Sequence, residues 1–165
     1  MSQKRDTDYL AVSTRIHAME NRMLTRERME RMIDAKDSGE AAKVLSECGY
    51  GELTQLTSAA LEELLADARR NTFRDMTDSV PDRRLVEVFQ LKYDYHNAKV
   101  LIKAQAMGLD EARLLSQGGR YDPQRLREDF LRDDLRDWGE VFRQAVLRAR
   151  EVLAATGDPQ QADLV

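Results

Sequence analysis

Cysteine, proline and glycine are all scarce in this sequence of 165 residues, and each shortage removes a class of structure. Cys48 is the one cysteine, so an intrachain disulfide is excluded and a cysteine-based zinc site lacks ligands. The chain therefore fits a reducing, cytoplasmic compartment. Three prolines and eight glycines, with almost no alternation of β-branched residues, argue against β-strands.

Long apolar runs and an excess of basic residues are also missing. No stretch reaches the roughly 18–20 apolar residues that a membrane span requires, and the polar N-terminus carries no visible secretion signal. Lys and Arg total 26 against 30 for Asp and Glu, which gives a net charge of −4. Because nucleic-acid binding depends on a basic surface, we expect no nucleic-acid partner.

Apolar residues recur every three to four positions between turn signals, which predicts an all-α fold. Eight helices are expected, over residues 8–23, 25–33, 37–48, 57–78, 82–107, 110–115, from 123 onward, and 137–157. Helix N-caps are expected at Thr25, Asp37, Thr57, Asp122 and Asp137. Glycines in left-handed conformation should end helices at Gly49, Gly108 and Gly157.

These helices fall into two sets of four in the same order, which suggests an internal repeat. The paired positions differ by 84 or 85 residues: Tyr9 and Tyr93, Arg15 and Lys99, Thr25 and Asp110, Asp37 and Asp122. We therefore expect residues 1–165 to form one all-helical unit of two stacked four-helix pseudo-repeats, 8–80 and 82–157. The alternative explanation is that helical proteins often space their caps similarly without any internal repeat.

Titratable residues with a catalytic or metal-binding pattern are few. His17 and His96 are the only histidines. His17 and Glu20 share a helix face and could supply two metal ligands, but no second pair completes a site. The sequence contains no phosphate-binding glycine loop, nucleophile elbow or zinc-protease motif. We therefore expect no cofactor. An enzyme that uses His17, Glu20 or His96 stays open as one alternative function.

The helix expected over 82–107 carries polar residues where a core would favour leucine. Helical spacing places Asp94 and Asn97 together on one stripe. Buried polar groups require hydrogen-bond partners, so we expect Asp94, His96 and Asn97 to bond across to a neighbouring helix. Arg15 of the first helix is the expected partner, giving a structural polar cluster.

A second stripe of the same helix is basic. Lys92, Lys99 and Lys103 line it together with His96. This stripe predicts a docking face for an acidic partner.

Several of these segments resemble a known family. They are residues 9–20 (YLAVSTRIHAME), 24–27 (LTRE), 35–50 and, most specifically, 92–99 (KYDYHNAK). The pattern is similar to the C subunit of the archaeal and bacterial V-type (A-type) ATP synthases, in a family that includes the d subunit of the eukaryotic vacuolar ATPase. Residues 154–164 resemble the family where its next repeat begins.

The resemblance implies a funnel-shaped, all-helical subunit, peripheral to the cytoplasmic face of the membrane. In that family the subunit is non-catalytic and belongs to the central stalk. It joins the rotor-shaft subunits to the proteolipid ring and couples ATP hydrolysis or synthesis to proton or sodium transport.

Family members are longer than this chain, which resembles roughly their N-terminal half. We therefore expect a fragment, with a natural short form as the alternative. Apolar faces left uncovered in such a fragment would favour self-association. A helical adapter or regulator, which binds a soluble partner in a groove between repeats, stays open as a different function.

Overall fold

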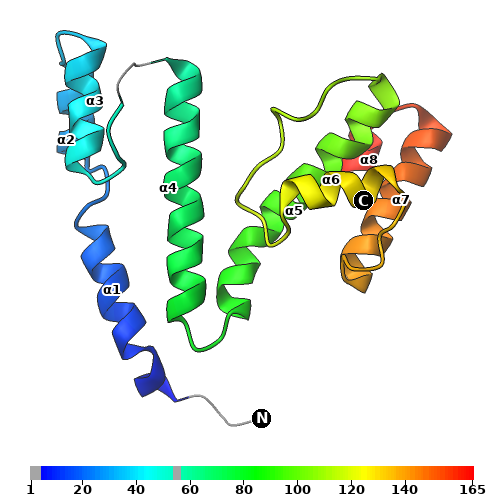
Figure 1. Ribbon diagram of the computed structural model, residues 1–165, viewed down its shortest axis with the longest axis horizontal. Coiled ribbons are helices and arrows are strands. Elements are labelled where there is room, and N and C mark those ends of the chain that lie inside the picture. The colour runs from blue at the N-terminus through cyan, green and yellow to red at the C-terminus, as the bar shows by residue number, and fades with distance from the viewer. Residues whose placement is uncertain (1–4, 54–56) are drawn as a thin grey trace. The chain divides into compact units, whose positions relative to one another are not determined.

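The structure is a computed structural model that describes residues 5–53 and 57–165, and within them it is all-α with no strand. Its elements are a 3-10 turn η1 (Asp6–Tyr9) and helices α1 (Leu10–Glu20), α2 (Arg26–Ile33), α3 (Ser38–Glu47), α4 (Ser58–Ser79), α5 (Arg84–Met107), α6 (Pro123–Leu131), α7 (Glu140–Thr156) and α8 (Pro159–Asp163) (Figure 1). The predicted fold class is confirmed. Residues 1–4 of the polar N-terminus and 54–56 of the predicted repeat 8–80 lie outside the described residues.

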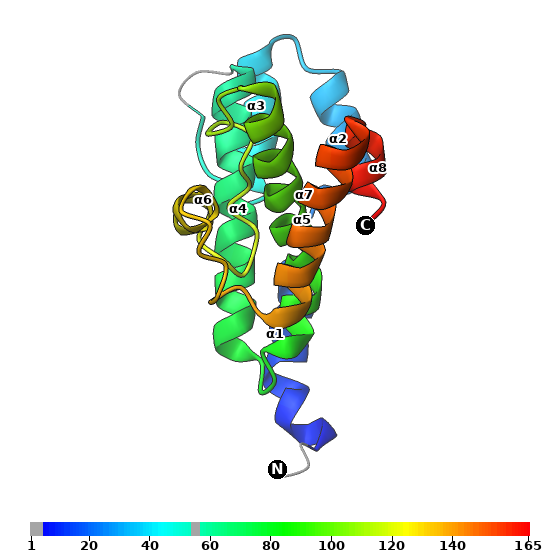
Figure 2. The ribbon, with the colours of Figure 1, turned by 90° about the vertical axis from the view of Figure 1, so that its right-hand side faces the viewer.

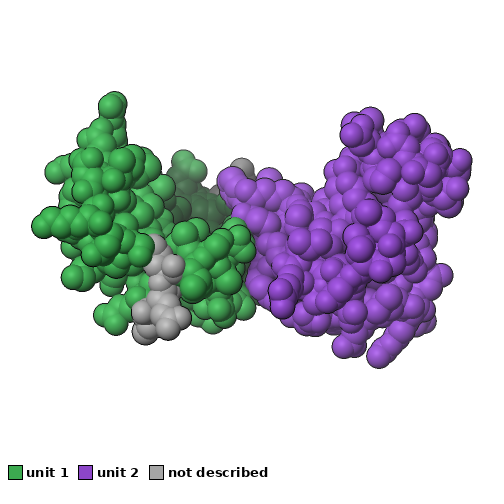
Figure 3. Space-filling model, turned by 90° about the horizontal axis from the view of Figure 1, so that it is seen from above, with its two compact units in different colours: residues 1–86 green, residues 87–165 purple. Residues whose placement is uncertain are grey.

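The chain divides into two compact units, residues 1–86 and 87–165 (Figure 3). The boundary falls inside α5, whose first turn belongs to the first unit. The relation between the pseudo-repeats 8–80 and 82–157 stays a prediction.

Several helix ends form as the local sequence predicts. Thr25 and Thr57 accept hydrogen bonds from backbone N–H groups in the first turns of α2 and α4, at 3.3 and 3.1 Å. Asp122 caps α6 by accepting from two N–H groups, at 3.1 and 2.9 Å. Gly108 and Gly157 follow α5 and α7 with φ of 65° and 66°, the left-handed conformation that L-residues adopt at a cost.

One predicted helix is wrong, and another begins later than predicted. Residues 110–115 form a turn and not a helix, because Asp110 accepts from the Ala112 N–H at 3.2 Å and so offers the backbone a competing partner. The last long helix begins at Glu140 and not at Asp137. Its N-cap is Gly139 at φ 70°, and Asp137 instead pairs with Arg125 at 2.6 Å.

Helix α8 is an addition to the predicted helices, because its signals also mark the end of the preceding helix. Asp158 caps it by accepting from the Gln160 N–H at 2.9 Å, and Pro159 stands at its first position. This is the same Asp-Pro arrangement that starts α6. The signal was therefore present in the sequence.

The first unit has a small core. Its buried apolar side chains come from α1, from α3 with the residue after it, and from the first turn of α5: Val12, Ala42, Val44, Leu45, Cys48 and Val86. Helix α2 packs on α3, and α1 contacts α4.

The second unit has a larger core built from α5, α6, α7 and α8. Helix α6 lies crosswise to α5 and α7 (Figures 1 and 2). Aromatic rings fill the space between them: Tyr95 meets Phe142 edge-on at 5.0 Å, and Trp138 lies 5.4 Å from Phe142, between ring centroids. Such aromatic pairs add stability beyond the area that they bury.

We predict that Leu126→Ala lowers the free energy of unfolding by about 2–5 kcal/mol, because it opens a cavity in this core. Leu126 is 1% exposed, whereas Leu131 on the same helix is 56% exposed. Leu131→Ala is therefore the matched control and should change the value by less than about 0.5 kcal/mol. Urea denaturation followed by circular dichroism measures both, and equal effects would contradict the packing described here.

Candidate functional site

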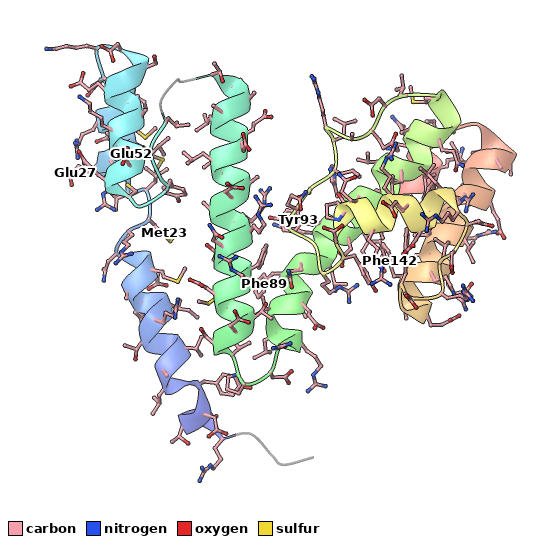
Figure 4. All side chains as sticks on the ribbon, in the orientation of Figure 1. Met23, Glu27, Glu52, Phe89, Tyr93 and Phe142 are labelled. Atoms are coloured by element: carbon pink, nitrogen blue, oxygen red, sulfur yellow. The ribbon has the colours of Figure 1, made fainter. Side chains whose placement is uncertain are left out.

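The connection between α5 and α6 is tied to α5 by polar side chains. It covers residues 108–122 and contains no helix. It passes back along α5 near Tyr93 (Figure 4), where Gly118 lies against the Tyr93 ring. Asp94 and Asn97, predicted to be buried, face it with 0% exposure.

Asp94 holds the end of this connection that leads into α6. Its Oδ1 accepts from the backbone N–H groups of Arg120 at 2.8 Å and Tyr121 at 3.3 Å, and its Oδ2 accepts from Arg120 Nε at 2.6 Å. A buried carboxylate is costly unless it is both paired and hydrogen-bonded. Asp94 meets both conditions, so its charge is compensated within the fold.

Arg120 completes this ion pair while its side chain stays 27% exposed. Partial burial lowers the pKa of the Arg120 guanidinium, but the hydrogen bond and charge of Asp94 outweigh that effect, and the pKa is raised above its ordinary value. The Arg120 guanidinium therefore keeps its charge at any physiological pH. Tyr121, the next residue, donates its hydroxyl to the Trp138 carbonyl at 2.6 Å and so connects the start of α6 to the start of α7.

His96 and Asn97 hold the middle of the connection, at Leu114 and Ser116. Asn97 Nδ2 donates to the Ser116 carbonyl at 2.9 Å, and its Oδ1 accepts from the Ser116 N–H at 2.7 Å. Asn97 therefore binds both backbone groups of one residue. His96 Nε2 lies 3.0 Å from the Leu114 carbonyl, which only accepts hydrogen bonds, so Nε2 carries the proton.

Two glycines allow the connection to lie this close to α5. A Cβ atom at Gly119 would overlap Asp94 Oδ1, and one at Gly118 would come within 2.9 Å of the Tyr93 ring. Neither glycine has a positive φ, so the requirement is for space and not for an unusual backbone. The sequence indicated a turn at these glycines but not its reason.

The predicted partner of this cluster, Arg15, belongs to the first unit, and its place in the cluster stays a prediction. Arg15 pairs with Asp75 of α4 in the first unit, at 2.9 Å. The partners of Asp94, His96 and Asn97 lie on the connection and not on a neighbouring helix. Arg120 was not predicted, although an arginine directly after a Gly-Gly turn is a reasonable cation for a buried aspartate.

The predicted docking lysines have different surroundings. Lys103 Nζ donates to Asp163 Oδ2 at 2.6 Å, and Lys99 Nζ donates to the Asp163 carbonyl at 2.9 Å. Lys92 is exposed, with its ammonium 4.8 Å from the centre of the Tyr93 ring. The docking role of these lysines stays a prediction.

His17 and Glu20 form an exposed pair, 2.9 Å apart. Within residues 5–53 and 57–165, no three His, Cys, Asp or Glu side chains gather as a metal site would require. None of the helices in this part of the chain is long and apolar enough to cross a membrane.

An open groove of about 1030 Å³ lies in the first unit, between α1 and α4. Its apolar lining includes Ile16, Met19, Met23, Leu64 and Met76. The carboxylates in its wall are already engaged with His17, Arg70 and Arg15. The described lining of the groove therefore offers apolar surface, and its carboxylates are already paired with cationic side chains or with His17.

Comparisons with known proteins agree on one family. The family model described as ATP synthase (C/AC39) subunit matches residues 12–165. A curated relative, the C subunit of the V-type sodium ATPase of Enterococcus hirae, is 23% identical over 122 residues. The aligned part is 73% of this chain but 37% of that relative, so the chain spans well under half of the relative's length. No solved structure matches.

We predict that Asp94→Ala lowers the free energy of unfolding by about 3 kcal/mol or more, because two N–H groups and Arg120 lose their acceptor. Asp134→Ala is the matched control, since Asp134 also pairs with an arginine, Arg136, at 2.6 Å but at the surface. Urea denaturation should show little change for the control. Similar losses for both variants would show that Asp94 has no special role.

Gly119→Ala should also destabilise the chain, by about 1–3 kcal/mol, because the added methyl group displaces the Asp94 carboxylate. Gln117→Ala, two positions earlier in the same connection, is the control. Thermal unfolding followed by circular dichroism compares the two. A Gly119→Ala chain as stable as the control would contradict the close approach.

Proposed function

Because the chain belongs to the ATP synthase (C/AC39) subunit family, we propose that it is part of a non-catalytic central-stalk subunit of a V/A-type rotary ATPase. Its partners are then the rotor-shaft subunits and the membrane proteolipid ring. By joining them it couples ATP hydrolysis or synthesis to the transport of protons or sodium. The position is peripheral, on the cytoplasmic face of the membrane.

The match of the family model over residues 12–165 is the observation that carries this proposal. It includes both compact units apart from the first residues of the chain. The described fold is compatible with it, since the structure is all-α and none of its described helices is suited to cross a membrane.

The polar cluster on α5 supports a mechanical role. A part that transmits torque must resist deformation, and a connection without secondary structure is the weakest place in a helical unit. Here that connection is held at three successive points by His96, Asn97 and Asp94. Most of the hydrogen bonds of these side chains join them to backbone groups of the connection, an arrangement that favours stiffness over catalysis.

Affinity purification tests the proposal directly. The gene is tagged at its chromosomal locus, the cells are extracted with a gentle detergent, and co-purifying proteins are identified by mass spectrometry. We predict enrichment of rotor-shaft and proteolipid subunits. A similarly tagged helical protein of comparable size and charge from the same cells is the control for nonspecific recovery.

A folded, tagged protein that recovers a soluble partner and no motor subunit would overturn the proposal in favour of an adapter. Circular dichroism of the purified chain establishes that it is folded. The Asp94→Ala variant adds an internal comparison, because loss of stiffness in the second unit should reduce the recovery of motor subunits.

A further inference from the structure

Two lysines of α5 converge on one residue of α8. Lys99 and Lys103 are one helical turn apart, and both contact Asp163, Lys103 through the carboxylate at 2.6 Å and Lys99 through the carbonyl at 2.9 Å. Lys99 Nζ is also 3.9 Å from Asp163 Oδ1. Two like charges at this spacing repel each other in the absence of a counter-ion. Asp163 supplies that counter-ion from within the chain.

Helix α8 packs on α7 and contributes one buried side chain to the core of the second unit. The helix has five residues, too few to be stable without packing. Ala162, at 5% exposure, is its contribution to the core of the second unit, while Leu164 directly after it is 87% exposed. Asp163 Oδ1 is buried and accepts no hydrogen bond, so this carboxylate is imperfectly satisfied where it lies. The ion pairs with α5 can therefore be exchanged at modest cost.

The basic surface continues beyond Asp163. Lys92 and His96 are exposed on the same face of α5, which presents Lys92, His96, Lys99 and Lys103 at intervals of four, three and four residues. Lys92 lies against an aromatic ring. A helix whose carboxylates repeat at this spacing would place one carboxylate opposite each of the three lysines.

We propose that this face of α5 binds an acidic helix of a partner protein, and that Asp163 is a built-in competitor occupying the Lys99 and Lys103 end of the surface. A partner carboxylate replaces that of Asp163, so the ion pairs at these lysines are conserved, and the partner gains contact with Lys92. The inference deepens the proposed function and rests on it only for the partner being another subunit of the motor. The binding chemistry follows from α5 and α8 alone.

A peptide titration tests the competition. The probe is a fluorescein-labelled, alanine-rich helical peptide with glutamate at every third or fourth position, added to the full chain at low salt. Asp163→Asn removes the competing charge while keeping the shape of the side chain. We expect it to tighten peptide binding by about three- to fivefold, the range of one exposed ion pair.

A second variant loosens α8 without changing Asp163. Asp158→Ala removes the N-cap of α8, so it should also tighten binding. The double variant Lys99→Gln/Lys103→Gln should weaken binding strongly. Its matched control is Lys36→Gln/Lys43→Gln, which removes the same charge from exposed positions in the first unit and should leave the affinity unchanged.

Unchanged affinity in Asp163→Asn would overturn the competition, and binding that survives loss of Lys99 and Lys103 would overturn the surface. Circular dichroism confirms that each variant is folded. Peptide binding that depends on Asp163, together with failure to recover motor subunits from cells, would uphold this inference while rejecting the proposed function. Recovery of motor subunits from cells, together with peptide binding that does not depend on Asp163, would reject this inference and leave the proposed function standing.

Discussion

Burial of the Asp94 carboxylate is the constraint around which the second unit is organised. Its side chain is 0% exposed, and a carboxylate so placed needs a cation and several donors to offset its lost hydration. Arg120 and two backbone N–H groups of the connection supply them. Because those donors lie directly before α6, satisfying Asp94 fixes where α6 begins relative to α5.

The consequences extend into the core. Tyr121 follows Arg120 and donates to the Trp138 carbonyl, and its ring stacks on Phe142 of α7 at 5.5 Å. One network of hydrogen bonds and rings thus runs from α5 through the connection to α7. Gly118 and Gly119 make the close approach possible, and Asn97 repeats the arrangement one turn along the helix. A unit fixed in this way changes shape with difficulty, as the proposed transmission of torque requires.

Local signals in the sequence predicted the local structure well. Thr25, Thr57 and Asp122 cap the helices that they were expected to cap, because a cap depends on residues within one turn. The polar character of Asp94 and Asn97 was also visible, but their partners were not, since they are 19 to 27 positions away along a connection of irregular backbone. The same limit explains Asp163, which lies 60 positions from Lys103. Residue type shows that a buried polar group needs a partner, and only the fold shows which one.

Amide hydrogen exchange measured by NMR tests the central role of Asp94 most directly. If Asp94 holds the connection, the Arg120 and Tyr121 amides should exchange only in the cooperative unfolding of the second unit, at the rate of core amides in α5. The Ala112 amide, bonded to an exposed aspartate in the same connection, should exchange far faster. Exchange of Arg120 and Tyr121 as fast as Ala112 would show that the connection opens by itself, and the account of a fixed second unit would be wrong.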